Sequence, residues 1–223
     1  MNTENKYARI AGVSFLISYL GLIVGSIILE PILANPLADA YSNAIQVGIG
    51  VLIESVNGIA VIGIAVMMYP ILKRHNEGIA LGYLGFRGVE GLLSILGSTK
   101  ALSLIELSNE YIQAGSPTNS YFDALSAIIL AERHWNMEML TVFFLLGAAL
   151  FYFLLYRTEA VPKYISVWGF IGVAGVIVVN LTAAYLGIIA IIFALPIIVN
   201  EFFIAIWLIL KGVDSSTIAT EVA

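Results

Sequence analysis

The chain has 223 residues, of which 60% are hydrophobic and only 11% are charged, and its mean hydropathy is +0.97. In soluble proteins about a quarter of the residues are charged, so this composition predicts an integral membrane protein whose partner is the lipid bilayer. The formal net charge of −5 argues against nucleic acid as a partner, because nucleic-acid binding calls for a basic patch. Without cysteine, the chain has no disulfide, no thiolate metal site and no cysteine nucleophile.

Six apolar segments reach the length of about 17–25 residues that crosses a bilayer. They span roughly residues 8–29, 47–72, 79–104, 131–156, 164–186 and 189–210. Their hydrophobic residues do not alternate as in strands, and a backbone in hydrocarbon must satisfy its own hydrogen bonds, so each segment is expected to be an α-helix. The sequence therefore predicts an all-α, polytopic membrane protein with one transmembrane domain over residues 1–223.

The basic residues predict how the helices are oriented. Seven of the ten lie at the chain ends or in loops on one side of the predicted membrane: Lys6, Arg9, Lys73, Arg74, Arg157, Lys163 and Lys211. Cytoplasmic loops carry the excess of Lys and Arg, so both termini are expected in the cytoplasm. The longest non-helical segment is expected at residues 105–127, on the outer side.

An offset of 84 residues aligns two glycine patterns without a gap. Gly85, Gly88 and Gly91 fall on Gly169, Gly172 and Gly175, each with Phe and Val at matching positions. This pattern predicts a parallel internal repeat of the second and third helices in the fourth and fifth. Small residues allow close helix packing in a membrane, which is the predicted role of all six glycines. Chance recurrence of Gly, Phe and Val in apolar sequence is the alternative.

Several polar residues lie inside the predicted helices, where a charged side chain at the helix centre costs about 2.5–3.5 kcal/mol on insertion. The candidates are Glu54, Arg87, Glu90, His134, Glu138, Asn200 and Glu201. Arg87 and Glu90 share one helix face, as do His134 and Glu138. We expect these residues to line one cavity that opens to the outside. Arg133 is expected closer to the outer interface, which leaves Arg87 as the permanent cation facing the glutamates.

Three functions fit this polar set. The first is a pocket or proton relay that binds or transports a small molecule or ion; six helices are few for a monomeric transporter, so it would require a homo-oligomer. The second is a membrane enzyme. It would use either a divalent metal such as zinc or manganese, held by His134, Glu138 and Glu90, or a metal-free acid/base pair of His134 and Glu138. The third is a structural hydrogen-bond network without catalysis.

Short motifs at three places are similar to those of a known family. They are Ala8-Arg9-Ile10-Ala11-Gly12, Phe86-Arg87-x-x-Glu90, and the last-helix pattern Pro196-x4-Glu201-x5-Trp207-Leu208-x2-Lys211-Gly212. With these motifs the chain resembles a family of uncharacterised bacterial and archaeal six-helix membrane proteins, domain of unknown function four-three-eight-six. The resemblance implies a prokaryotic cytoplasmic-membrane protein and draws attention to Arg87, Glu90 and Glu201. It implies no activity, because the family has none established.

Overall fold

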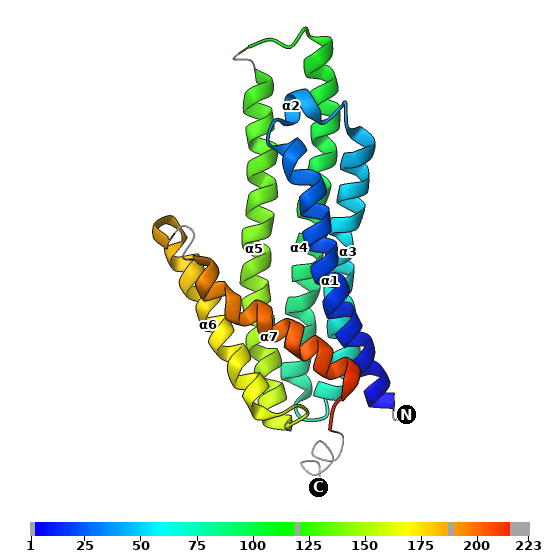
Figure 1. Cartoon of the computed structure of the whole chain (residues 1–223), viewed down its shortest axis with the longest axis vertical. Coiled ribbons are helices and arrows are strands. Elements are labelled where there is room, and N and C mark those ends of the chain that lie inside the picture. The colour runs from blue at the N-terminus through cyan, green and yellow to red at the C-terminus, as the bar shows by residue number, and fades with distance from the viewer. Residues whose placement is uncertain (1–2, 119–120, 187–189, 215–223) are drawn as a thin grey trace. The chain divides into compact units, whose positions relative to one another are not determined.

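The computed structural model describes residues 3–118, 121–186 and 190–214, which form seven α-helices and contain no strand (Figure 1). Six are long and apolar enough to cross a membrane. They are α1 (Thr3–Leu33), α3 (Ala44–Leu72), α4 (Glu77–Gln113), α5 (Tyr121–Thr158), α6 (Lys163–Leu186) and α7 (Ala190–Leu210). The seventh, α2 (Pro36–Asp39), is a single turn. The predicted helical class and the six apolar segments are confirmed, although residue 189 lies outside the described residues.

The expected non-helical segment at residues 105–127 is wrong over most of its length. Helix α4 continues to Gln113, and α5 already begins at Tyr121. The prediction ends each helix where the apolar sequence ends. The polar residues beyond that point still favour helix, so both helices extend past their apolar parts. Gly115 ends the α4 region with φ +83, the left-handed conformation that glycine adopts without strain.

The chain forms two compact units. Unit 1 comprises Met1–Leu16, Val61–Val89 and Val142–Ala223, and unit 2 comprises Ile17–Ala60 and Glu90–Thr141. In unit 1, α6 packs closely against α7. A Cβ added at Gly172 would lie 2.7 Å from the Cα of Ile197, so glycine is what permits this approach.

Unit 2 contains parts of α1, α3, α4 and α5 that run side by side, with α2 at one end (Figure 1). The connection that carries α2 is anchored to α4. The Ser108 hydroxyl donates to the Leu37 carbonyl at 2.8 Å and accepts from the Tyr41 amide at 3.1 Å. Leu29, Val51 and Leu104 belong to the buried apolar core beneath this connection.

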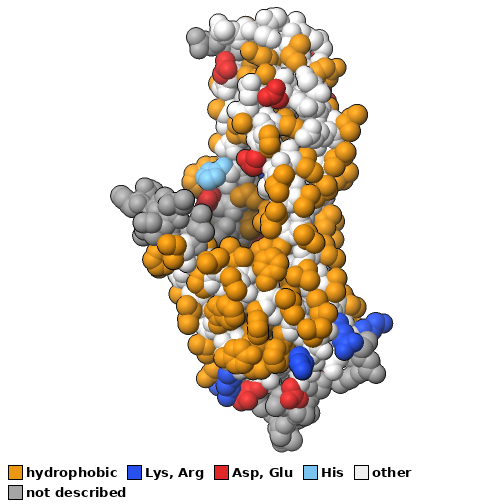
Figure 2. Space-filling model, viewed as in Figure 1, with side chains coloured by type: hydrophobic (Ala, Val, Ile, Leu, Met, Phe, Trp, Pro, Cys, Tyr) orange, Lys and Arg blue, Asp and Glu red, His pale blue; other side chains and the backbone are white. Residues whose placement is uncertain are grey.

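The surface is largely apolar, as expected for helices that face lipid. Large apolar side chains such as Leu20, Ile27 and Ile45 are exposed, and Figure 2 shows hydrophobic atoms covering much of the visible face. The seven basic residues used to predict orientation all belong to unit 1, and Figure 2 shows Lys and Arg gathered where α7 ends. The cytoplasmic position of both termini stays a prediction.

Candidate functional site

A buried ion pair joins α5 to α3 inside unit 2. The Arg133 guanidinium donates from Nη1 to Glu54 Oε2 and from Nη2 to Glu54 Oε1, both at 2.8 Å. The Glu54 side chain is 1% exposed and that of Arg133 is 10% exposed. Two parallel charge-assisted hydrogen bonds make this the strongest polar contact type available to the two residues. Arg133 Nη1 also donates to the Gly97 carbonyl on α4 at 3.2 Å.

Close helix approach positions both partners of the pair. A Cβ added at Gly25 on α1 would lie 2.6 Å from the Cβ of Glu54, so α1 packs directly against the α3 backbone at the ion pair. The Ser26 hydroxyl donates to Glu54 Oε1 at 3.3 Å. Gly97 allows α4 to approach α5, because a Cβ there would lie 3.1 Å from the Met137 side chain. Four helices therefore meet at the pair.

The ion pair forms part of the wall of a cavity of about 440 Å³. This cavity, called the unit 2 cavity, is separate from the one that Tyr41 and Ile45 line in the same unit. It is lined by Leu22, Ser26, Glu30, Leu33, Ala34, Glu54, Leu130, Arg133, His134 and Met137. Glu30 Oε1 lies 3.9 Å from Arg133 Nη2, beyond hydrogen-bond distance, and its side chain is 67% exposed. Two carboxylates thus face one guanidinium, which gives the charged wall an excess of one negative charge. The exposed Glu30 and His134 bring the cavity to the surface of unit 2.

A second buried polar group lies one turn further along α3. The Ser18 hydroxyl donates to Asn57 Oδ1 at 2.8 Å, and Asn57 Nδ2 donates to the Ser94 hydroxyl at 3.0 Å. These bonds join α1, α3 and α4 through neutral groups. The three side chains are hydrogen-bonded to one another, so the group fixes helix register and presents no charge to a ligand.

The sequence-predicted residues of unit 2 differ in their surroundings. Glu54 and Glu90 are buried, whereas His134 is exposed and the Glu138 side chain is 45% exposed. His134 Nε2 lies 3.9 Å from Glu138 Oε1. His134 lines the cavity beside Glu54, while Glu138 is not part of its lining.

The other predicted residues, Arg87, Asn200 and Glu201, are buried in unit 1. Asn200 joins three helices there: its Nδ2 donates to the Ile165 carbonyl at 2.9 Å, and its Oδ1 accepts from the Tyr152 hydroxyl at 2.7 Å. The Arg87 guanidinium lies 5.7 Å from the centre of the Phe144 ring. Because the seven predicted residues divide between two units, the single shared cavity stays a prediction.

Sequence reasoning missed Arg133, which was expected near the outer interface. The structure instead buries it against Glu54, so Arg87 is not the one permanent cation among the buried carboxylates. A signal for this pairing was present. Glu54 and the His134 region come out at a similar depth when helix positions are counted from the outer ends, and a buried glutamate needs a nearby cation. Tyr152, the partner of Asn200, was not selected either.

The expected metal ligands do not form a cluster. Within residues 3–118, 121–186 and 190–214, no three His, Cys, Asp or Glu side chains come close enough together to hold a metal ion. Within the predicted set of His134, Glu138 and Glu90, His134 Nε2 lies 3.9 Å from Glu138 Oε1.

The six glycines assigned to packing differ in their surroundings. A Cβ at Gly169 would overlap the Tyr152 ring, and Gly172 and Gly175 lie against the α7 backbone. A Cβ at Gly85 or Gly88 would meet no described atom within 4 Å, so close packing at these two glycines stays a prediction. A Cβ added at Gly58 on α3 would overlap the Gly91 carbonyl oxygen on α4. The close α3–α4 contact therefore requires glycine at position 58. The predicted repeat therefore does not extend to equivalent packing.

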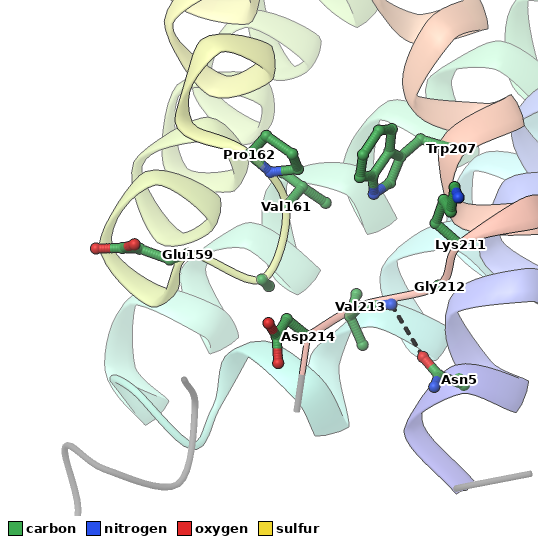
Figure 3. A pocket seen from close by; sticks show the side chains of 10 residues that line it. Asn5, Glu159, Val161, Pro162, Trp207, Lys211, Gly212, Val213 and Asp214 are labelled. Carbon is green, nitrogen blue, oxygen red and sulfur yellow. Dashed lines mark hydrogen bonds between the residues drawn. The ribbon is translucent and has the colours of Figure 1, made fainter. Parts of the chain in front are cut away.

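Unit 1 has a cavity of its own, of about 690 Å³, at the end of α7 (Figure 3). The chain after α7 forms one side: the Val213 amide donates to Asn5 Oδ1 at 2.9 Å, and the Asp214 amide donates to the Ala160 carbonyl at 3.0 Å. Figure 3 shows Glu159, Lys211 and Asp214 around this cavity, and all three are exposed. It lacks the buried charges that distinguish the cavity of unit 2.

Comparison with known proteins places the chain in a family. A family model described as "Domain of unknown function (DUF4386)" matches residues 10–212. The chain belongs to the DUF4386 family. No curated protein and no solved structure matches this DUF4386 protein. The family match includes every residue of the Glu54–Arg133 pair and its cavity, but it brings no activity, so the chemistry must be argued from the site.

The unit 2 cavity of this DUF4386 protein can do two things chemically. Its charged wall can bind a polar group through charge-assisted hydrogen bonds, which are stronger than hydrogen bonds between neutral groups. Its apolar wall, which includes Leu22, Leu130 and Met137, can bury hydrocarbon. A cavity of about 440 Å³ lies within the size range of small-molecule sites.

Proposed function

We propose that this DUF4386 protein binds a small molecule or ion in the unit 2 cavity and transports it across the membrane. The observation that carries the proposal is the Glu54–Arg133 pair, which is almost fully buried and yet forms part of a cavity wall. Ionisable residues inside membrane segments mark substrate and ion pathways more often than they serve stability.

Energetics support a functional role for the pair. Moving each charge out of water carries a penalty of several kcal/mol, and well-packed apolar residues of similar volume are often at least as stabilising. A hydrogen bond between membrane helices contributes only about 0.6 kcal/mol on average. An ion pair is therefore a costly means of fixing helix register. The Ser18–Asn57–Ser94 group shows that α1, α3 and α4 are joined by neutral side chains instead.

We further propose that the protein lies in a prokaryotic cell membrane with both termini in the cytoplasm. The support is the set of seven exposed basic residues in unit 1, since cytoplasmic loops carry this excess. The natural chain has no cysteine, so single cysteines report topology directly. An impermeant thiol reagent added to intact cells should label Ser116→Cys and leave Lys73→Cys unlabelled. Labelling of Lys73→Cys alone would reverse the orientation.

The same cysteine-free background tests the cavity. Thiolates react only where water reaches them, so a hydrophilic reagent should label Met137→Cys in the cavity faster than Leu20→Cys on the apolar surface of α1. A ligand found by thermal-shift screening in lipid nanodiscs should slow the labelling of Met137→Cys. Ala34→Trp, which adds bulk at the cavity rim without removing a polar side chain, should abolish that stabilisation. Equal labelling of both cysteines would refute a water-filled cavity.

An acid/base enzyme is the second candidate, and one observation favours it. His134 lines the cavity and lies 3.9 Å from Glu138, so an imidazole is available to move a proton on a bound substrate. If a ligand that binds the cavity is chemically changed, His134→Asn should stop the change while leaving ligand stabilisation in place. A bound ligand recovered unchanged would count against the enzyme.

A further inference from the structure

We propose that the ligand of the unit 2 cavity is a small organic cation, an amine or guanidine with an apolar body, whose charged end is received by Glu30. The inference rests on the proposed function, and it adds the chemical class of the ligand.

Charge balance is the first argument for a cation. Glu54 is already matched by Arg133, because its Oε1 and Oε2 each accept from the guanidinium at 2.8 Å. Glu30 is the second carboxylate of the cavity, and its side chain is 67% exposed. Its Oε1 forms only a long ion-pair contact with Arg133 Nη2, at 3.9 Å and outside hydrogen-bond distance. The guanidinium is thus committed to Glu54, and the cavity presents one negative charge to an incoming ligand. An anion would meet two carboxylates and a cation that is already neutralised.

The donor set argues for an organic cation over a metal ion. Divalent metals need several oxygen or nitrogen ligands converging on one point. The described residues bring no three His, Asp or Glu side chains together in that way. An ammonium or guanidinium group needs only a few acceptors, and a carboxylate is its strongest partner. Glu30 supplies the carboxylate, and the nearby lining adds the Ser26 hydroxyl oxygen and the His134 imidazole.

The rest of the cavity wall indicates that the body of the ligand is apolar. Leu22, Leu33, Leu130 and Met137 line the cavity with hydrocarbon and a thioether. Burial of apolar ligand surface on such a wall contributes affinity in proportion to its area, and methionine adapts to varied shapes. A bare inorganic cation would leave this surface without a partner.

Three probes of one skeleton test the inference: benzylammonium, benzyl alcohol and benzoate, each titrated calorimetrically against the full chain in zwitterionic nanodiscs. Benzylammonium should bind and the other two should not bind measurably. Glu30→Gln should weaken benzylammonium binding by about tenfold or more, the effect of one charge-assisted hydrogen bond. Glu132→Gln, which removes a partly exposed carboxylate paired with Lys100 at 2.6 Å, is the matched control and should leave binding unchanged.

The outcomes separate this inference from the function on which it rests. If benzyl alcohol or benzoate binds and Ala34→Trp abolishes that binding, the cavity is a ligand site and the cationic class is wrong. If Glu30→Gln leaves benzylammonium binding unchanged, the assigned receptor is wrong. If Ala34→Trp changes the binding of no probe, neither the cavity nor its ligand class stands.

Discussion

Replacing either half of the Glu54–Arg133 pair should destabilise the protein, but the two replacements should not be equal. In Arg133→Met, the Glu54 carboxylate stays 1% exposed and keeps one hydroxyl donor, that of Ser26 at 3.3 Å. Leaving one partner of a buried pair uncompensated costs about 3–5 kcal/mol.

Glu54→Leu should cost less, about 1–3 kcal/mol, because the guanidinium left behind has other acceptors. Arg133 Nη1 keeps the Gly97 carbonyl at 3.2 Å, and Glu30 is already 3.9 Å from Nη2. The long arginine side chain can also turn its charge toward the cavity. The double variant Glu54→Leu/Arg133→Met removes both charges and should be no less stable than Arg133→Met alone.

Equilibrium unfolding in mixed micelles, followed by the fluorescence of the chain's three tryptophans, measures these free energies. The coupling free energy of the pair should be at least about 1 kcal/mol, the lower limit of the cost of Glu54→Leu, and should exceed that of the partly exposed Lys100–Glu132 pair. The reasoning is refuted if Arg133→Met lies within about 0.5 kcal/mol of the natural protein, or if the two pairs show equal coupling.

Two further predictions concern packing and a neutral hydrogen bond, and both use the same unfolding assay. Gly58→Ala should destabilise by about 1–3 kcal/mol, because its Cβ would overlap the α4 backbone, whereas Gly85→Ala should be neutral or stabilising by up to about 1 kcal/mol; equal effects would contradict the contact. Asn200→Leu should cost about 1–3 kcal/mol by leaving the buried Tyr152 hydroxyl without its acceptor, and adding Tyr152→Phe should recover part of that loss. No recovery would show that Tyr152 finds another acceptor.

The transmembrane helices were predictable because bilayer thickness fixes the length of an apolar span. Each predicted segment falls within one observed helix, apart from residue 189. The helix ends were not predictable in the same way. Hydropathy reports where lipid-compatible sequence stops, and the polar stretch from Glu106 to Gln113 remains helical beyond that point.

The candidate site was only partly predictable. Glu54 was selected because a carboxylate in an apolar segment is conspicuous, but its partner lies 79 residues away on another helix. Sequence gives the depth of Arg133 approximately and the direction of its side chain not at all. The direction depends on how α5 is rotated against α3 and α4, and the close contact of Gly97 on α4 with the Met137 side chain on α5 constrains that rotation.

The glycines also show what sequence alone cannot predict. The pattern shared by Gly85 and Gly169 indicates small residues on two helices, but only contact with a neighbour makes a small residue necessary. Gly169 has the Tyr152 ring against it, and Gly85 has nothing described within 4 Å. Identical motifs can therefore differ in what they do, because packing depends on the facing helix and not on the motif.

The contact of Gly25 with the α3 backbone makes one side of the cavity wall more rigid than the other. Glu54 is held from behind by α1 and by the Ser26 hydroxyl, so its carboxylate is preorganised and has little freedom to follow a ligand. Met137 on α5 lines the same cavity with an unbranched, flexible side chain that adapts to varied shapes. Any adjustment to ligands of different shape should therefore come from α5, while α1 and α3 supply the fixed template against which those ligands are selected.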